Sequence, residues 1–547
     1  MRHHTGEEVV VQLSARITAG SRGSSPTARL PAAATRMLIE RLGPGVRPVD
    51  ADPAAVAAGL PAGRLPHHAG ISADPADRLT HAAGESLADW IARRAGRLTV
   101  VPDAVAHPQH PDDVRALLDF AASAGAAVVP RGGGTSVVGG VTPTSVDRPV
   151  LVLDLLGLAG LRAFDPRSGL ATFGAGTTGP DIEAALGPHG WMLGHLPQSW
   201  ARATVGGWIA ARSVGQQSLG VGRMESLFAG GRVEAPAGTL VLPPHPASAA
   251  GPDLRQLVLG SEGRFGVVTE ATVRAVPRPD EERFPALFVP DWETGLAAAR
   301  ALVQARLPLA MVRLSGSLET SALLALGGRP AVSAALAGYF RLRRLPPSPC
   351  MLLLALAGRR RIVGAAEADA RAILAEHGAI RGPGAIGRAW ARSRHGALDL
   401  RAALWTHGYA VDTLETAADW SRLPPLADAL ITALRNGLAD IDERVVAFGH
   451  LSHLYSSGSS LYVTCVYRVA ADPAETLRRW HNLKAAASRA IVAGGGTISH
   501  QHGVGTDHLP YLEAEKGALG LDILRAVGKR LDPDGLMNPG VLIPPRP

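Results

Sequence analysis

The chain has 547 residues, more than a single hydrophobic core usually organises, so we expect at least two domains. Its formal net charge of +7 and its pI of about 9.9 favour anionic partners such as phosphate esters or acidic lipid surfaces. The sequence holds no zinc-finger spacing, no RNA-binding aromatic motif and no long run of Lys or Arg, which argues against nucleic acid as a partner.

Cysteine content and hydropathy indicate the compartment. The two cysteines, Cys350 and Cys465, cannot build a disulfide framework and suit a reducing environment. The N-terminus lacks the charged and apolar regions of a signal peptide, and no apolar run reaches the ~18 residues that a membrane span needs. We therefore expect a cytoplasmic protein, with peripheral contact at a membrane surface as an open alternative.

Residues 1–70 are rich in Ala, Pro, Gly and Ser and predict a poorly packed N-terminal extension with one helix at 34–42. Ser86 then begins a helix that is expected to end at Arg94. Asp89 supports this start, because an acidic residue three positions after Ser completes a capping box.

A strand predicted at 99–102, an amphipathic helix and a second strand at 124–129 precede the most informative stretch of the chain. The helix begins near His110 and places four apolar residues on one face: Val114, Leu117, Leu118 and Ala121. Strand, helix, strand and glycine-rich loop is the order of an α/β nucleotide-binding unit.

The glycine-rich stretch runs from Pro130 to Gly140. Its three consecutive glycines lack Cβ atoms, so the backbone can approach a ligand closely and turn its N–H groups toward an anion. Thr135 and Ser136 add hydroxyl donors, and a pyrophosphate suits such a cradle. The spacing matches neither the Walker A loop nor the Rossmann fingerprint, and for this stretch alone a mobile surface loop is the alternative.

Two further glycine-rich turns, at 204–212 and 257–271, also adjoin apolar β-type sequence. Before them we expect short strands at 150–155 and 170–175 and a helix at 181–186. One extended dinucleotide lying across a sheet explains the three glycine-rich turns together.

Beyond Pro279 strands alternate with helices, which predicts an α+β second domain. Strands are expected at 286–289, 310–314 and 459–467, and helices at 293–305, 365–377, 426–438 and 474–492. The two basic clusters of this half, at 341–344 and 359–361, are interpreted as solvated helix faces.

Five motifs in this order resemble the flavin oxidases of the vanillyl-alcohol oxidase type: the glycine loop, TVGGW at 204–208, GSEGRFGVVTEA at 260–271, SHQHGVG at 499–505 and LDP at 531–533. Within that family the chain looks most like the alkyldihydroxyacetonephosphate synthases (alkylglycerone-phosphate synthases) and their bacterial relatives. The resemblance covers the chain from residue 71 to its end. It implies FAD as cofactor, and we expect non-covalent attachment because the first glycine loop has neither His nor Cys; His195 is the exception.

The FAD segments of the family fall on four stretches of this sequence: 130–136, 198–204, 211–214 and 262–268. The residues that the resemblance implies for FAD binding are Pro130, Arg131, Gly132, Gly133, Gly134, Thr135, Ser136, Gln198, Ser199, Thr204, Gly206, Gly207, Ala211, Arg212, Ser213, Glu262, Gly263, Gly266, Val267 and Val268.

The resemblance also implies the reaction residues. Tyr462 matches the proton-accepting tyrosine of the family, and Arg401 matches the arginine thought to hold substrate phosphate. His500 and His502 match its paired histidines, and on a strand they would share one face. Arg313 matches a structurally important arginine. To act as a base, Tyr462 would need its pKa lowered from ~10.

Each of these residues also has a plainer explanation, and the sequence departs from the family pattern. A strand tyrosine such as Tyr462 is commonly part of a core, and Arg401 can form a surface ion pair with Asp399. The family has a third histidine where this chain has Gln501, and Arg264 with Phe265 stands where Thr-Leu is usual. The short Trp-containing motif that precedes the FAD domain in the animal enzymes is missing as well.

Metal binding is a rival interpretation. Glycolate and D-lactate dehydrogenases also resemble this chain, and they hold a divalent ion with histidines. Here His450 and His453 remain, whereas Gln501 and Ser457 stand where further ligands are expected. We therefore expect no metal.

Together these observations predict a mixed α/β chain of the α+β class. We expect an N-terminal extension at 1–70, a two-lobed FAD-binding domain at 71–279, and an α+β cap and substrate domain at 280–547 whose C-terminal segment returns to the flavin. The resemblance implies exchange of the acyl chain of acyl-dihydroxyacetone phosphate for a fatty alcohol through a flavin N5 adduct. The alternatives are an FAD-linked oxidase or dehydrogenase of a D-2-hydroxy acid and a non-enzymatic flavin-binding protein. A lipid phosphate or other small substrate, and a homodimer, are further expectations.

Overall fold

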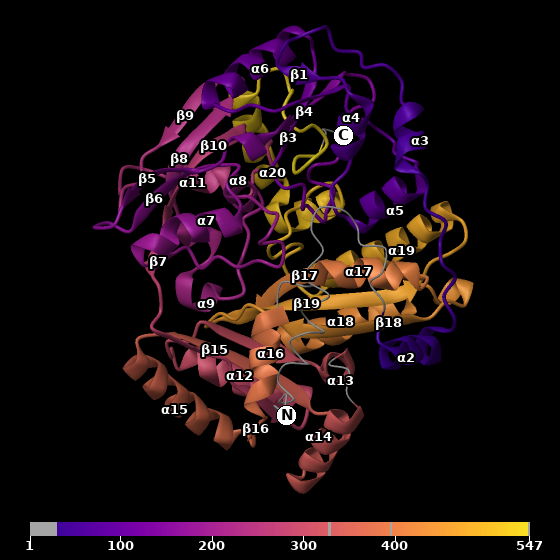
Figure 1. Ribbon diagram of the computed structural model, residues 1–547, viewed down its shortest axis with the longest axis vertical. Coiled ribbons are helices and arrows are strands. Elements are labelled where there is room, and N and C mark those ends of the chain that lie inside the picture. Colours follow the sequence, from indigo (N-terminus) through magenta and orange to yellow (C-terminus); the bar gives the residue numbers. More distant parts are fainter. Residues whose placement is uncertain (1–29, 327–329, 394–396, 545–547) are drawn as a thin grey trace, which may run out of the picture. The chain divides into compact units, whose positions relative to one another are not determined.

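The computed structural model describes residues 30–544, apart from 327–329 and 394–396 (Figure 1). Its contacts divide the chain into two compact units. Among the described residues, the glycine-loop unit comprises 49–215, 221–278 and 498–544, and the cap unit comprises 30–48, 216–220 and the described part of 279–497.

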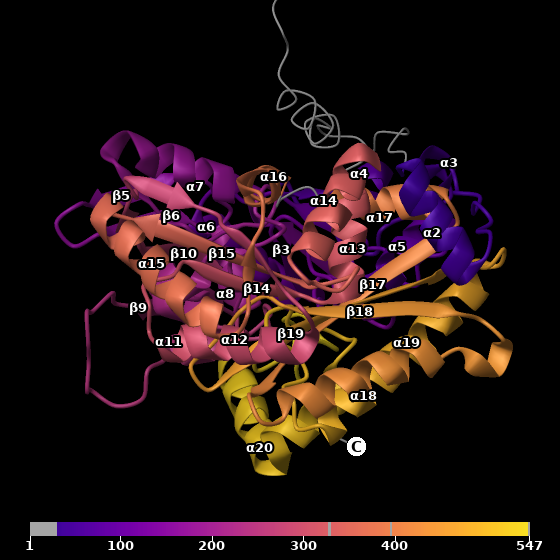
Figure 2. The same ribbon diagram turned by 90° about the horizontal axis from the view of Figure 1, so that it is seen from below.

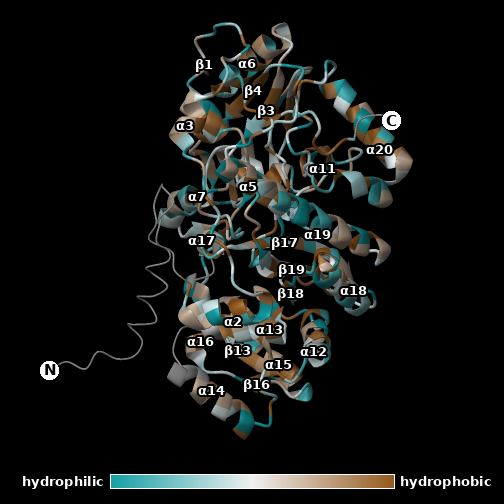
Figure 3. Cartoon of the chain, turned by 90° about the vertical axis from the view of Figure 1, so that its right-hand side faces the viewer, coloured by the Kyte–Doolittle hydropathy of each residue, from teal (hydrophilic) through white to brown (hydrophobic). Residues whose placement is uncertain are grey.

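The first sheet of the glycine-loop unit has the strand order β1-β2-β4-β3 (Ile71–Ser72, Ala104–Ala106, Val150–Asp154, Ala127–Arg131). Strands β2, β4 and β3 are parallel, and β1 is antiparallel to β2. The four apolar residues predicted to share one helix face are all buried on α6 (Pro111–Ser123), where they form a core cluster with Leu151 and Leu153. In the hydropathy colouring of Figure 3, β3 and β4 are correspondingly brown.

The prediction of a strand at 99–102 is wrong, because strand β2 begins only at Ala104. Pro102 has no amide hydrogen to donate to a neighbouring strand. Asp103 instead closes the end of the sheet, since its carboxylate accepts the Val150 N–H at 2.7 Å.

A second sheet of this unit is antiparallel, with the order β5-β6-β10-β8-β9 (Leu161–Asp165, Leu170–Gly174, Val267–Arg274, Phe228–Ala235, Gly238–Leu242). Two helices of the same unit, α7 (Gly179–Leu186) and α8 (Val205–Ala210), bury Ile182, Leu186, Trp208 and Ile209 in the core cluster that includes the inner residues of β6, β8 and β10. The residues from 498 onward belong to this unit, and their long helix is α20 (Leu512–Leu531).

The cap unit is built on an eight-stranded sheet with the order β16-β13-β15-β14-β18-β19-β17, and β12 pairs with β15. The bounds of these strands are Ile380–Arg381, Ala286–Val289, Cys350–Gly358, Met311–Ser315, Val445–Leu451, Gly458–Arg468, Tyr409–Asp419 and, for β12, Glu281–Arg283. Figure 2 shows α12, α15, α18 and α19 (Trp292–Gln304, Arg360–Glu376, Leu423–Asn436, Pro473–Ala493) along one face. The other face carries α2, α13, α14, α16 and α17 (Ala32–Leu42, Ser317–Leu326, Pro330–Leu342, Gly384–Ser393, Ala397–Thr406).

Helix α2 shows how part of the expected N-terminal extension is packed. Leu38 and Leu42 are buried in a cluster with Leu404, Tyr409 and Val466 of the cap unit. The Tyr409 hydroxyl donates to the Gly43 carbonyl at 2.7 Å, so a buried polar group also holds the end of the helix. Residues 1–29 lie outside the described part of the chain.

Most other predicted elements occur within a few residues of their expected bounds, including the helix that Ser86 caps through the Asp89 amide (α5, Leu87–Ala95). His500 and His502 lie in an irregular segment rich in bends, and not on a strand that would place them on one face. Among the described residues, no helix combines the length and the apolar content needed to cross a membrane.

Candidate functional site

The glycine loop is packed so tightly that side chains are excluded at its centre. A Cβ on Gly133 would lie 1.8 Å from the Arg202 carbonyl oxygen, and one on Gly132 would lie 2.4 Å from Thr204 Oγ1. Such distances are impossible for real atoms. The structure therefore brings the first expected FAD segment, 130–136, against the second, 198–204.

The loop offers a row of free backbone donors. Among the residues that the structure describes, none accepts a hydrogen bond from the amides of 133–136. Gly134 has a φ of +65°, and the Arg131 guanidinium is tucked beneath it. Burial lowers the pKa of Arg131, and the Asp154 carboxylate opposes that shift. Consecutive unpaired amides beside a buried cation form a nest that fits the pyrophosphate of FAD.

Glu262 joins three distant stretches of the glycine-loop unit. Its carboxylate accepts the backbone N–H groups of Val504 and Gly505 at 2.6 and 2.7 Å. Asn538 Nδ2 donates both to the Glu262 carbonyl at 2.7 Å and to the Gly140 carbonyl at 2.9 Å. Burial raises the pKa of Glu262 to about 7, although the two amides oppose this. The glycine loop, the fourth FAD segment and the C-terminal residues are therefore fastened at one point.

The fourth expected FAD segment, 262–268, also has a backbone conformation that requires glycine. Gly263 and Gly266 have φ values of +77° and +123°, which L-residues rarely adopt. A Cβ on Gly266 would lie 2.6 Å from the Glu234 carbonyl. Val267 and Val268, which follow, are buried at the start of β10.

The second and third segments meet around helix α8. Thr204 caps the helix by accepting the Gly207 N–H at 3.2 Å, and the Gly206 N–H donates to the Ala175 carbonyl at 2.9 Å. After the helix, Arg212 takes a left-handed φ of 53°, which turns the chain between Ala211 and Ser213. Gln198 is exposed, and Ser199 accepts the Arg202 and Ala203 amides through its carbonyl.

His195 is a buried support of the third segment. Its Nε2 lies 3.2 Å from Ser213 Oγ, and its ring packs edge-on against Trp208 with centroids 4.7 Å apart. Burial lowers the pKa of His195 to about 3, so the imidazole is neutral at pH 7.

In the cap unit, Glu415, Tyr462 and His450 form one row across three neighbouring strands. Tyr462 on β19 pairs directly with Glu415 on β17 and with His450 on β18. Direct cross-strand partners project to the same face of a sheet. The Tyr462 and His450 rings are stacked, with centroids 4.7 Å apart and 16° between their planes.

Behind His450 lies a buried ion pair. Arg313 Nη2 donates to Glu319 Oε1 at 2.7 Å, and His450 Nδ1 lies 3.1 Å from the same oxygen. Burial acts to raise the pKa of Glu319, yet the positive charges that His450 and Arg313 can carry hold it at about 2. Burial and the Arg313 cation lower the pKa of His450. A chain of contacts therefore links Arg313 to Tyr462 through Glu319 and His450.

Arg401 lies in a second polar cluster beside the same row. Its Nη2 is 4.0 Å from Asp412 Oδ1, and its side chain is 18% exposed. Asp412 is also bound by Trp480 Nε1 at 2.7 Å and approached by Lys484 Nζ at 3.7 Å. Arg401 thus contacts a buried acid inside the cap unit; the side chain of Asp399 lies outside the described set.

The environment of Tyr462 opposes ionisation. Burial raises the pKa of Tyr462 to about 12, and the Glu415 and Asp412 carboxylates add to this, whereas Thr413 and Arg401 act the other way. The lowered pKa that a resting base would need is therefore not found in the cap unit. The phenol is protonated at pH 7.

The four residues expected to take part in the reaction are divided between the two units. Tyr462 and Arg401 belong to the cap unit, and His500 and His502 belong to the glycine-loop unit. His500 is buried, and its segment is held where Glu515 Oε2 accepts the Ile498 N–H at 3.0 Å.

The metal alternative involves His450 and His453, whose rings lie near different carboxylates. His450 lies beside Glu319, whereas His453 Nε2 is 3.9 Å from Glu415 Oε1 and its Nδ1 is 3.4 Å from Ser218 Oγ. These contacts do not test the expectation that the protein holds no metal.

Sequence reasoning missed the buried acids Glu319, Asp412 and Glu415. The signal for two of them was visible, because Asp412 and Glu415 interrupt an otherwise apolar and β-type run at 409–419. A buried carboxylate in a strand requires a partner. Asp412 is bound by Trp480 and approached by Lys484 and Arg401. Glu415 accepts from Ser452 and is the cross-strand partner of Tyr462.

Comparison with known proteins agrees with this geometry. The FAD binding domain family matches residues 102–242, and the C-terminal domain of FAD linked oxidases matches residues 278–542. An alkyldihydroxyacetonephosphate synthase of Dictyostelium discoideum is 28% identical over 86% of this chain and 78% of its own length. A solved structure of an alkyldihydroxyacetonephosphate synthase has a TM-score of 0.78, with 24% identity over 92% of each chain. The glycolate oxidase subunit GlcD of Bacillus subtilis is 26% identical over 80% of this chain and 88% of its own length.

The chain belongs to the FAD-linked oxidases, and it is an FAD-dependent enzyme. Within that class it is of the alkyldihydroxyacetonephosphate synthase type, which the shared fold and the coverage of both chains support.

Proposed function

We propose that this enzyme replaces the fatty acyl chain of acyl-dihydroxyacetone phosphate by a fatty alcohol. The exchange consumes the alcohol, releases the fatty acid and leaves an ether, with no net oxidation or reduction. The observation that carries the proposal is that Arg401 lies beside the row that holds Tyr462 in the cap unit, close enough for its positive charge to act on the phenol. A cation for phosphate and a phenol for proton transfer are two of the groups that this exchange uses, and His500 and His502 are the others that we propose.

Arg401 is suited to bind the substrate phosphate. Its contact with Asp412 is loose, at 4.0 Å, and Asp412 has Trp480 and Lys484 as further partners. The guanidinium can therefore turn its donor fork toward a phosphate without leaving a buried carboxylate unpaired.

Tyr462 is suited to hold and move one proton. Because burial keeps its phenol neutral, it enters the reaction as a proton donor, and the resulting phenolate is the acceptor in the next step. His450 fixes the plane of the ring by stacking against it. The flavin, when bound, supplies the electrophilic ring on which the exchange of acyl for alkyl depends.

The binding residues for FAD are those of the four segments around the glycine loop. The unpaired amides of 133–136 suit its pyrophosphate, and Glu262 fastens the surrounding stretches. We propose non-covalent attachment, which a flavin released by trichloroacetic acid into the supernatant would support.

The test is the reaction itself. Purified holoenzyme is mixed with acyl-dihydroxyacetone phosphate and a fatty alcohol, and fatty acid release and ether formation are followed together. We expect equal amounts of both products. Flavin-loaded enzyme that releases no fatty acid would exclude this function.

A second candidate is a D-2-hydroxy-acid oxidase or dehydrogenase, favoured by the similarity to a glycolate oxidase subunit. Arg401 would then hold the substrate carboxylate. Anaerobic mixing separates the two functions, because only a hydroxy acid that donates hydride would bleach the oxidised flavin.

We further propose a cytoplasmic enzyme that forms a homodimer and meets its lipid phosphate substrate at a membrane surface. The net charge of +7 supports contact with anionic lipid. Sedimentation velocity of the purified protein tests the dimer, and vesicle flotation tests the surface contact.

A further inference from the structure

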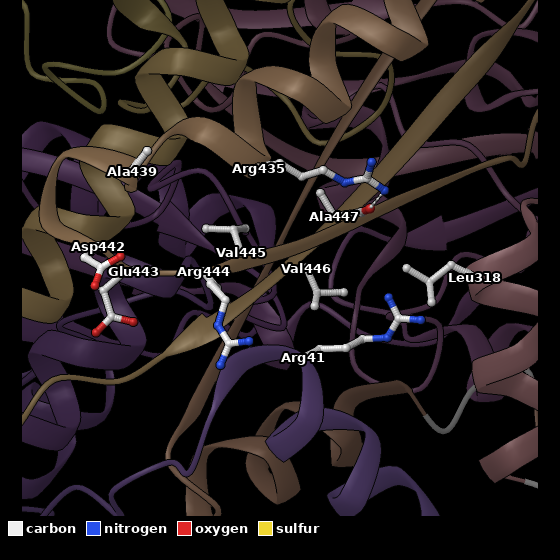
Figure 4. A pocket seen from close by; sticks show the side chains of 10 residues that line it. All are labelled: Arg41, Leu318, Arg435, Ala439, Asp442, Glu443, Arg444, Val445, Val446 and Ala447. Atoms are coloured by element: carbon white, nitrogen blue, oxygen red, sulfur yellow. Dashed lines mark hydrogen bonds between the residues drawn. The ribbon is translucent and has the colours of Figure 1, made fainter.

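The cap unit has a pocket of about 570 Å³ at the beginning of strand β18 (Figure 4). It lies at the opposite end of the β18–β19 hairpin from the proposed reaction residues. Val445 to Ala447 line the pocket, whereas His450 pairs with Tyr462 further along β18. The lining residue nearest to His450 along this strand is Ala447, three positions or ~10 Å away, so the pocket lies at a different place on the strand from the reaction residues.

Three arginines from three different elements line this pocket: Arg41, Arg435 and Arg444. Arg41 lies in the last turn of α2, Arg435 in the last turn of α18, and Arg444 immediately before β18. Figure 4 shows their side chains around the same hollow. Elements that are far apart in sequence therefore present their positive charges to one space.

Two of the three arginines are oriented by carbonyl groups. Arg435 Nη2 donates to the Ala447 carbonyl at 3.1 Å, and Arg444 Nη1 donates to the Glu40 carbonyl at 3.4 Å. Arg41 forms no hydrogen bond or ion pair with any residue in the described part of the chain. Carbonyls orient a guanidinium without cancelling its charge, so all three remain available to an anion.

The acidic residues at the pocket do not neutralise it. Glu443 is taken by two other arginines, since its carboxylate accepts Arg468 Nε and Nη2 at 3.0 and 2.9 Å and lies 3.1 Å from Arg479 Nη1. Asp442 is exposed and stands on the far side of the pocket from Arg41 in Figure 4. The space between Arg41, Arg435 and Arg444 is therefore positive.

We propose that this pocket binds a small phosphate monoester. Planar guanidinium groups bind phosphate oxygens in pairs, and Arg41 and Arg444 approach from two sides. Leu318 and Val446 give the carbon part of such a ligand an apolar wall. A volume of about 570 Å³ lies in the range of metabolite-sized sites. The same chemistry is offered by a soluble phosphorylated metabolite and by the monoester headgroup of phosphatidic acid.

The test measures binding of inorganic phosphate to the holoenzyme by equilibrium dialysis, because bound FAD keeps phosphate from the glycine loop. The double variant Arg41→Gln/Arg444→Gln is expected to lose one phosphate site, with affinity at that site falling at least tenfold. Arg401→Gln is expected to retain this site, which separates it from the proposed reaction site. Arg371→Gln, on the exposed side of α15, is the matched control and is expected to bind as the wild type.

Unchanged phosphate binding in the double variant would overturn the proposal. If that variant loses its fold, as judged by its melting temperature, phosphate binding is measured with the single variant Arg41→Gln instead. This variant is expected to fold, because Arg41 is exposed and forms no contact that the fold needs. Flotation with phosphatidylcholine vesicles, with and without phosphatidic acid, then identifies the source. Flotation that requires phosphatidic acid, Arg41 and Arg444 assigns the site to the lipid headgroup. Phosphate binding that depends on the same arginines without flotation assigns it to a soluble monoester.

Discussion

The rings of His450 and Tyr462, which are direct partners across β18 and β19, stack with their centroids 4.7 Å apart. His450 in turn lies 3.1 Å from Glu319, and Glu319 accepts a hydrogen bond from Arg313. A buried chain of contacts therefore runs from a charged pair in β14 and α13 to the phenol that is proposed to carry the proton. Its members are predicted to set the position of that phenol rather than to touch the substrate.

The first prediction concerns the Tyr462 hydroxyl. Tyr462→Phe keeps the ring that stacks on His450 and removes only the proton-carrying group. We expect fatty acid release to fall by roughly 100-fold or more, which is the usual loss when a general acid–base group is removed. Flavin content is expected to stay unchanged. The measurement is kcat with saturating substrate.

Tyr339→Phe is the matched control. Its hydroxyl donates to the Arg381 carbonyl of the cap unit at 2.7 Å, and it lies on α14, away from β17, β18 and β19. A comparable loss of activity in both variants would show that the effect is structural.

The pH dependence gives a second view of the same group. Since burial raises the pKa of Tyr462 to about 12, the phenol stays protonated up to high pH. If it enters the reaction as a donor, its ionisation produces no fall in kcat between pH 6 and 9. A rise in kcat with pH through this range that is lost in Tyr462→Phe would instead identify a resting base.

Glu319 is the subject of the third prediction. Glu319→Gln preserves size but leaves the buried Arg313 cation without its carboxylate. Breaking a buried ion pair on one side costs about 3 kcal/mol, so a lower melting temperature is expected. Because the His450 ring loses its anionic neighbour, kcat should also fall while KM for the phosphate substrate, set by Arg401, changes little.

The exposed Glu293→Gln, on α12 of the same unit, controls for the loss of one negative charge. Its kcat should match that of the wild type, and its stability should fall by at most ~1 kcal/mol, because Glu293 lies in the first turn of the helix. An unaltered kcat in Glu319→Gln would mean that the ion pair does not position Tyr462.

Much of the fold could be predicted from local sequence patterns. The apolar face of α6 and the Ser86 cap of α5 were predictable, because both depend on residues close together in sequence. The strand at 99–102 was not, because its fate depends on Asp103 closing the ladder at Val150, a residue 47 positions away. The bent segment that carries His500 and His502 was not predicted from the sequence either.

In the candidate site, too, the features that depend on neighbouring residues could be predicted, and those that depend on distant contacts could not. The glycine loop could be predicted because its three consecutive glycines are visible in the sequence itself. No sequence pattern indicates the contact of Glu262 with the amides of Val504 and Gly505, because it joins residues more than two hundred positions apart. Likewise, the sequence suggested that Tyr462 would need a lowered pKa, but only the structure shows that burial of the phenol, with the Glu415 and Asp412 carboxylates nearby, raises its pKa instead.

The fourth prediction follows from Glu262. Its pKa in the folded protein is about 7, above its ordinary value of 4.5, because burial disfavours the carboxylate. A raised pKa contributes stability that is fully present below pH 4.5 and is lost as pH rises through 7. At 1.36 kcal/mol per pKa unit, the loss is on the order of 3 kcal/mol.

The measurement is the melting temperature of wild type and Glu262→Gln across this pH range. The wild-type value should decline relative to that of the variant as pH rises. Parallel curves for the two proteins would show that Glu262 does not titrate in this range.

The last prediction concerns Gly133, where the glycine loop meets the second FAD segment. In Gly133→Ala, the new Cβ would lie 1.8 Å from the Arg202 carbonyl oxygen, so the loop must move away from 198–204. The amides of 133–136 then lose the arrangement that fits a pyrophosphate, and we expect purified protein with little or no bound flavin. The matched change is Gly364→Ala in α15, where a Cβ meets no atom within 4 Å. That variant should keep its flavin and gain helix stability of about 1 kcal/mol, because Ala is the better helix former. The ratio of flavin to protein absorbance measures both results, and a normal ratio in Gly133→Ala would show that the close approach of these two segments is not needed to hold FAD.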